Sequence, residues 1–135
     1  MRVLAVSLFG LFVSGTAAVA CPALNMSQGA TSFGIDQLLV PQAVSLTAGG
    51  NQSLDQCGLG PLGYGQFRSA PDYSFLVTDT LGRDVVLAVT SQCDATMLVN
   101  TADGQWHFND DSNGNLDPRF VIPAGAALNG QVDVW

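Results

Sequence analysis

The chain contains no glutamate and no lysine: its 11 acidic residues are all aspartate and its 4 basic residues are all arginine. Glutamate and lysine are strong helix formers and supply the exposed face of most amphipathic helices. Glycine, valine, threonine, asparagine and aspartate, which are abundant here, favour strands and turns instead. The sequence therefore predicts an all-β fold.

The charge balance narrows the range of partners. The formal net charge of the 135 residues is −7, and no lysine is available to contact a phosphate backbone. Proteins that bind nucleic acid present clustered basic residues, so we expect no nucleic-acid partner. A chain of this length can bury a core of its own without depending wholly on covalent links.

Residues 1–20 have the pattern of a signal peptide. A basic start precedes an apolar run at 3–13, and Ala18 and Ala20 place small residues where a signal peptidase reads them. The apolar run is shorter than the roughly 20 residues that a membrane span needs, and no later segment approaches that length. We therefore expect cleavage after Ala20, no membrane span, and a secreted or periplasmic protein.

The three cysteines are Cys21, Cys57 and Cys93. Cys21 follows the expected cleavage site and would be the acceptor of a lipoprotein anchor. Bacterial lipoboxes favour leucine three places before the cysteine, however, where this chain has Ala18, so lipid attachment is the weaker interpretation. Cysteines of exported proteins usually pair, and an odd number leaves one over as a free thiol, an intermolecular bridge or a residue whose partner is missing.

Short strand-like segments follow one another from residue 38 to the end of the chain. None has a helical pattern worth naming. Asp103 and Gly104 form a strong hairpin signal, and the glycine-rich stretch 58–65 is predicted to be a loop. The expected strands lie at 38–46, interrupted at Pro41, and at 73–77, 85–90, 96–100, 105–108, 120–122 and 131–135.

This succession of short strands and turns is typical of an antiparallel β-sandwich or jelly roll, here a single domain over residues 21–135. Residues 131–135 alternate polar and apolar like the opening of a half-buried strand, and the sequence stops there without a turn or polar tail. We expect the sandwich to lack its last strand.

The stretch 109–118 is rich in side-chain oxygens. Calcium needs six to eight oxygen ligands from a loop that wraps around it. The loop is not an EF-hand, because the glutamate that closes that loop does not exist in this chain. The alternative is turn chemistry, since asparagine and aspartate cap their own backbone in long connections. The candidate calcium ligands are Asp110, Asp111, Asn113, Asn115 and Asp117.

Trp106, His107 and Phe108 form an aromatic cluster. On a strand, Trp106 and Phe108 share one face and His107 points the other way. An exposed aromatic face would let Trp106 and His107 bind a sugar ring or an apolar side chain of a partner protein. The alternative, which we favour, is that Trp106 and Phe108 fill the core, because a small domain needs its large apolar residues there.

The sequence offers little for catalysis. His107 is the single histidine, and no nucleophile-elbow motif or cluster of zinc ligands accompanies it. Pairs of aspartates occur by chance in any acidic exported domain, so they do not indicate a hydrolase. We expect the chain not to be an enzyme.

From about residue 46 onward, the order of motifs resembles the bacterial pre-peptidase C-terminal domain. Individually weak, the motifs stand in the right order: Tyr73-Ser74-Phe75, 85–89, Asp94 before Met97-Leu98-Val99, Asp103-Gly104, Asn109-Asp110-Asp111, Ile122-Pro123-Ala124-Gly125 and Val132-Asp133-Val134. The resemblance implies an exported β-sandwich of the kind appended to secreted proteases, whose relatives can carry a peptidase name without being peptidases. It also implies a later cysteine, and hence a Cys21–Cys57 pair with Cys93 left for the missing partner.

Two functions follow from these observations. The first is an exported, noncatalytic binding or accessory module, calcium-stabilised, whose loops at 109–117 and 58–65 contact a protein or carbohydrate ligand. The second is a fragment of a secreted, peptidase-associated hydrolase whose catalytic residues lie outside this chain. A complete reading frame that adds only a strand and a cysteine would favour the first.

Overall fold

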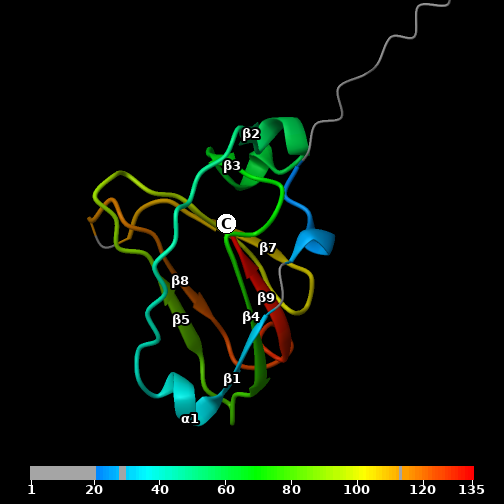
Figure 1. The fold of residues 1–135 in the computed structure, drawn as a ribbon, viewed down its shortest axis with the longest axis vertical. Helices are drawn as coiled ribbons and strands as arrows, with labels where there is room; N and C mark the ends of the chain where they lie inside the picture. The colour runs from blue at the N-terminus through cyan, green and yellow to red at the C-terminus, as the bar shows by residue number, and fades with distance from the viewer. Residues whose placement is uncertain (1–20, 28–29, 113) are drawn as a thin grey trace, which may run out of the picture.

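The computed structural model describes residues 21–27, 30–112 and 114–135 and has an all-β fold (Figure 1). The expected signal peptide at 1–20 lies outside the described residues. At the centre is a five-stranded sheet, in which β1 and β4 run parallel and the other neighbours run antiparallel. Its strands, in spatial order, are β1 (Thr31–Gly34), β4 (Tyr73–Asp79), β9 (Gly130–Val134), β6 (Met97–Asn100) and β7 (Trp106–Asn109).

Two antiparallel ribbons pack against this sheet. One ribbon, β5 (Val85–Ala88) with β8 (Arg119–Ile122), covers part of one face and encloses the main core. The other, β2 (Gln52–Ser53) with β3 (Gln66–Phe67), encloses a smaller core on the opposite face. The main core contains Phe75, Val77, Val85, Met97, Val99, Ile122, Leu128 and Val132; the smaller core contains Leu54, Phe67, Leu98 and Trp135.

Strand β6 is buried on both of its faces. Met97 and Val99 point into the main core, and Leu98, between them, points into the smaller core. Side chains alternate across a strand, so an unbroken apolar run is what a strand between two layers requires. The Asp103-Gly104 hairpin signal is confirmed: β6 pairs with β7, Asn100 opposite Trp106, across a turn in which Gly104 has φ +79°.

The expected strands after residue 70 are confirmed, with small shifts at their ends, whereas the strand expected at 38–46 is wrong. Its first residue closes the one-turn helix α1 (Ile35–Leu38), and the segment after it has no regular structure. Pro41 lacks the N–H group that a paired strand donates. A short parallel strand, β1, lies before α1 where no strand was expected, so the sheet is not purely antiparallel.

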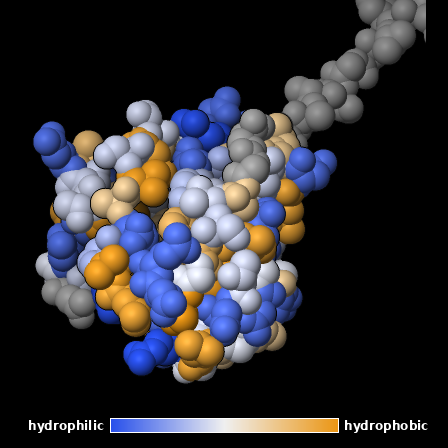
Figure 2. Space-filling view, turned by 60° about the horizontal axis from the view of Figure 1, so that its bottom comes forward, coloured by the Kyte–Doolittle hydropathy of each residue, from blue (hydrophilic) through white to orange (hydrophobic). Residues whose placement is uncertain are grey.

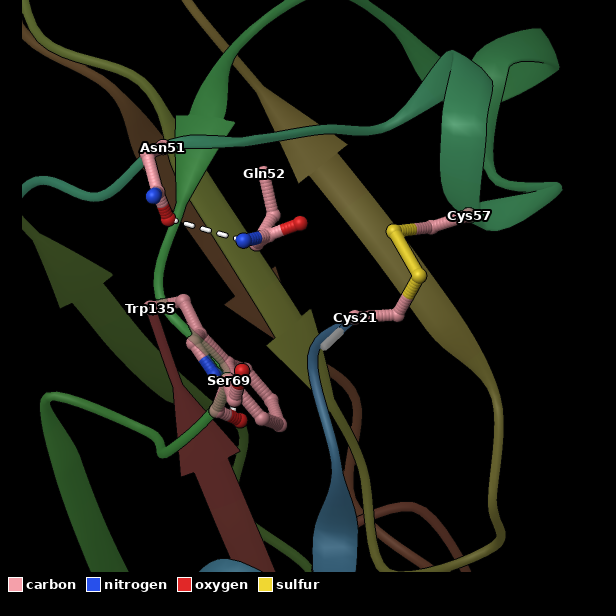
Figure 3. Close-up of a disulfide and its surroundings, with 6 residues drawn as sticks. All are labelled: Cys21, Asn51, Gln52, Cys57, Ser69 and Trp135. Atoms are coloured by element: carbon pink, nitrogen blue, oxygen red, sulfur yellow. Dashed lines mark hydrogen bonds between the residues drawn. A yellow bond between two sulfur atoms is a disulfide. The ribbon is translucent and has the colours of Figure 1, made fainter. Parts of the chain in front are cut away.

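Three 3₁₀ turns join the remaining elements: η1 (Leu24–Met26), η2 (Asp55–Cys57) and η3 (Gly60–Leu62), the last within the predicted loop 58–65. A disulfide joins Cys21 to Cys57, as the resemblance implied, and attaches the start of the described chain to η2 (Figure 3). Beside it, the backbone N–H of Ala23 and the indole Nε1 of Trp135 both donate to the carbonyl of Ser69. Cys93 is free and exposed.

A buried carboxylate links the start of the described chain to the central sheet. Asp133 on β9 is 4% exposed and accepts hydrogen bonds from Ser27 Oγ at 2.7 Å, from Gln131 Nε2 at 2.9 and 3.0 Å, and from Ser74 Oγ on β4. Three donors satisfy the carboxylate, as burial of a charge requires. Asp133 thus joins segments more than 100 residues apart in sequence.

We expect Asp133→Ala to lower the free energy of unfolding by about 2 kcal/mol, because the substitution leaves the buried Ser74 hydroxyl without its acceptor. Urea unfolding followed by tryptophan fluorescence measures the change. The exposed Asp36→Ala is the control and should stay within about 0.5 kcal/mol of the parent. Equal losses for the two variants would contradict the role given to Asp133.

Candidate functional site

An apolar groove opens where the β5–β8 ribbon ends above the β1 side of the sheet. It has a volume of about 1170 Å³ and lies between β5 and residues 39–48, here called the strap. In Figure 1 the strap, in cyan, runs from α1 along the outside of β5 towards β2. Aliphatic and aromatic side chains dominate the lining, among them Phe33, Leu38, Tyr73, Phe75, Leu87 and Val89.

One charged side chain of the lining is buried. The side chain of Asp72 is 5% exposed, and its Oδ1 lies 3.0 Å from Nε of Arg68. That Nε–H donates instead to the carbonyl of Gly49 at 3.1 Å, and no described residue donates a hydrogen bond to Oδ1. Burial raises the pKa of Asp72 above its ordinary value, and the charge of Arg68 offsets part of the increase. The groove thus has a largely apolar lining with one buried carboxylate, which is ion-paired with Arg68.

The outer surface around the groove is also apolar in part. Four strap residues, Leu39, Val40, Val44 and Leu46, are 48% to 60% exposed, as is Val86 of β5 at 47%. Figure 2, turned so that the α1 end comes forward, shows hydrophobic residues in orange reaching the surface at several places. Exposed apolar side chains that gather beside a groove mark a binding surface more often than scattered ones do.

The oxygen-rich loop between β7 and β8 is held by hydrogen bonds of its own. Oδ1 of Asn109 accepts from the backbone N–H of Arg119 at 2.8 Å and from Ser112 Oγ at 3.0 Å. Oδ1 of Asp117 accepts from the backbone N–H of Ser91 at 3.0 Å, and Asn115 Nδ2 lies 3.5 Å from the other oxygen of Asp117. These hydrogen bonds match the alternative interpretation of the loop, in which asparagine and aspartate side chains cap the backbone. Asn113 lies outside the described residues.

Of the predicted calcium ligands, the structure brings Asp110 and Asp111 together, and it adds Asp94. Carboxylate oxygens of the three lie within 4.8 Å of one another, all on exposed side chains. Partial burial and repulsion from Asp111 and Asp94 raise the pKa of Asp110 above its ordinary value. Asp94 was not among the predicted calcium ligands. The β6–β7 register, with Met97 opposite Asn109, places the residues before β6 beside those after β7 and is the signal that identifies it.

His107 has a structural environment. Its ring lies 4.6 Å from that of Phe120, centroid to centroid, and its Nε2 lies 3.2 Å from Thr101 Oγ1. The Thr101 hydroxyl also lies within hydrogen-bond distance of Asp103 Oδ1, at 2.6 Å, and of the Gln105 carbonyl, at 3.2 Å. The Thr101 hydrogen bond also lowers the pKa of Asp103.

Trp106 and Phe108 point away from His107, as predicted for alternate residues of a strand. Both are half-buried and pack against the smaller core, and the Trp106 ring lies 5.1 Å from that of Trp135. This is the packing role that we favoured for the pair. The alternative, that Trp106 and His107 bind a ligand, stays a prediction.

A scan against protein-family models finds no match, and neither does a search of curated proteins or of solved structures. The resemblance to the pre-peptidase C-terminal domain stays a prediction. The groove, its buried carboxylate and its surrounding apolar surface are therefore the features from which a function can be inferred.

Proposed function

We propose that the protein is an exported, noncatalytic binding module that takes an elongated apolar ligand into the groove between the strap and β5. The groove itself carries the proposal. Binding sites for small molecules are concave, mostly apolar and about 300–1,000 Å³ in volume, with a few polar groups that orient the ligand. The groove, at about 1170 Å³, has this composition and is slightly larger than that range.

The charge around the groove selects among apolar ligands. Asp72 Oδ1 is ion-paired with Arg68 at 3.0 Å but accepts no hydrogen bond from the described residues, so a ligand with a hydrogen-bond donor at one end would satisfy it by displacing Arg68. A cationic donor gains further from the net charge of −7, and an anionic end is repelled. An alkyl chain ending in an ammonium or hydroxyl group fits this chemistry, and a fatty acid does not.

Export is supported by the signal-peptide pattern at 1–20 and by the Cys21–Cys57 disulfide, since disulfides persist in oxidising compartments. The disulfide also uses the sulfur that a lipid anchor at Cys21 would need. None of the helices in the described part of the chain has the length and apolar character that crossing a bilayer requires.

A noncatalytic role is supported by the packing of His107, whose ring lies 4.6 Å from that of Phe120 and whose Nε2 lies 3.2 Å from Thr101 Oγ1. The hydrolase fragment remains the alternative, and it requires catalytic residues from outside this chain. A protein or carbohydrate partner at Trp106 and His107 remains a second kind of ligand, for which the half-buried packing of Trp106 leaves only a small exposed surface.

We expect dodecylamine and dodecanol to displace a fluorescent apolar dye from the protein at pH 7, and dodecanoate to bind at least tenfold more weakly than the amine. Asp72→Asn should remove most of the preference for the amine, since the variant loses the carboxylate and keeps the positive charge of Arg68. Lowering the pH through the raised pKa of Asp72 should also weaken amine binding, because the carboxylate loses its charge.

Two variants of β5 and β8 locate the binding. Ala88→Trp adds bulk to a residue that lines the groove and should weaken dye binding at least tenfold. Val121→Trp adds bulk to the exposed face of β8, outside the lining, and should leave it unchanged. If the dye fails to bind, or if both variants bind it like the parent, the groove is not the ligand site.

We also propose that calcium stabilises the loop between β7 and β8, with Asp94, Asp110 and Asp111 as the charged ligands. The proximity of the three carboxylates supports it, because a cation relieves the repulsion among them, which adds to desolvation in raising the pKa of Asp110. The remaining ligands would be oxygens of Asn113, Asn115 and Asp117 or water. The hydrogen bonds of Asn115 and Asp117 described above would have to rearrange.

For a dissociation constant of about 1 mM, 10 mM calcium should raise the melting temperature by about 5 °C. Asp110→Asn should abolish that increase. Without calcium the variant should melt slightly higher than the parent at pH 7, because the folded-state pKa of Asp110 lies above its ordinary value and stability is lost as the pH rises through it; solvent screening keeps the difference small. The exposed Asp36→Asn should respond to calcium as the parent does. An unchanged parent melting temperature would remove the calcium proposal.

A further inference from the structure

The strap has the sequence of a strand but not the hydrogen bonds of one. It includes Val40, Val44 and Leu46, and its composition predicts a strand. In the structure, residues 41–48 make no backbone–backbone hydrogen bond to any described residue. Side chains hold the strap at its two ends: Gln42 Nε2 donates to the carbonyl of Gln37 at 2.7 Å, and Arg68 donates to those of Thr47 and Gly49, each at 3.1 Å.

Strand β5 presents an open edge to the same groove. Its one described partner is β8. The backbone N–H of Val89 donates to Pro118, and hydrogen-bonded pairs alternate along an antiparallel ladder. The backbone groups of Val86 and Ala88 therefore face away from β8. Residues 83–91 line the groove without interruption and residues 119–122 do not, so this open edge borders the groove.

The strap and β5 run in the same direction. The strap begins at α1, and α1 follows the end of β1, which is paired with Asp79 at the end of β4. The strap leads to Gly50, which lies against the Phe67–Arg68 peptide. Arg68 is paired with Asp72, just before β4 begins. β5 follows β4 through the turn after Asp79 and so runs back along the same path. Figure 1 shows the strap running beside β5 from α1 towards β2. A ladder between the two would be parallel.

Pro41 selects the register of such a ladder. A strand directs the backbone groups of alternate residues to the same side, so a partner on that side sees either the even or the odd residues. Proline has no N–H to donate and is tolerated in an edge strand where its nitrogen faces away. The backbone groups of the even-numbered residues must then face β5. The side chains of these residues lie together on one face of the strap. Four of the five even-numbered strap residues are aliphatic, namely Val40, Val44, Leu46 and Ala48, and the fifth is Gln42.

We propose that the strap closes onto β5 as an additional parallel edge strand, with the even-numbered residues pairing and their aliphatic side chains entering the groove. The inference rests on the proposed function, because the space that the strap fills is the ligand site. The structure is the open state. Gly49, at φ +123°, and Gly50 form the pivot, since a side chain at Gly50 would clash with the Phe67–Arg68 peptide. Ligand binding then competes with closure.

Amide hydrogen exchange measured by NMR on the full chain tests the closure directly. In the unmodified protein, the amides of Val86 and Ala88 should exchange at least tenfold more slowly than in an unstructured peptide. Gln42→Pro/Val44→Pro removes two donors of the ladder and should abolish this protection. The matched control, Ala43→Pro/Ser45→Pro, places its prolines where Pro41 is already accepted and should keep it. Protection of Val99 in the central sheet reports that each variant is folded.

Dodecylamine binding by the same proteins separates the two proposals. If the strap is closed nine times in ten, the even-proline variant should bind about tenfold more tightly than the parent, and the odd-proline control should bind like the parent. Unprotected Val86 and Ala88 amides in the unmodified protein would overturn the closure, whether or not the amine binds. Protection that follows the expected pattern, without amine binding by any variant, would uphold closure and overturn the proposed ligand site.

Discussion

A two-stranded ribbon packed on a five-stranded sheet is the constraint from which the rest of the structure follows. Val85 of β5 and Ile122 of β8 pack with Phe75 and Val132 of the sheet, and this contact buries the main core. Two strands cannot cover five, so part of the sheet needs another cover. On the β7 side the loop after β7 reaches β8. On the β1 side the cover is the strap, which lacks a ladder and leaves the groove beneath it.

The strands after residue 70 were predictable because their evidence is local: period-two alternation, β-branched runs and turn residues such as Asp103 and Gly104. The strap was mispredicted for a physical reason, since a strand needs a partner as well as a propensity, and the open edge of β5 is set by the packing of distant segments. β1 depends on its parallel pairing with β4, more than 40 residues away, and carries little pattern of its own.

The candidate sites likewise divide into those that local sequence indicates and those that depend on tertiary packing. Residue types pointed to Asp110 and Asp111, but Asp94 joins them through the hairpin register, which a scan of a single loop does not include. The favoured alternative for Trp106 came from the size of the core, a property of the whole chain. The groove was beyond sequence reasoning, because its lining runs from Phe33 to Trp135 and no local pattern connects those residues. Asp72 has the same limitation, since its burial is a tertiary property.

The side chain of Asn109 has a mechanical consequence. Its carbonyl accepts the backbone N–H of Arg119, so a side-chain amide takes the place of a peptide group and links the end of β7 to β8. This hydrogen bond fastens the ribbon to the sheet at the β7 edge. We expect the spacing between the two layers to vary least beside Asn109 and most at the β1 side, where the groove lies.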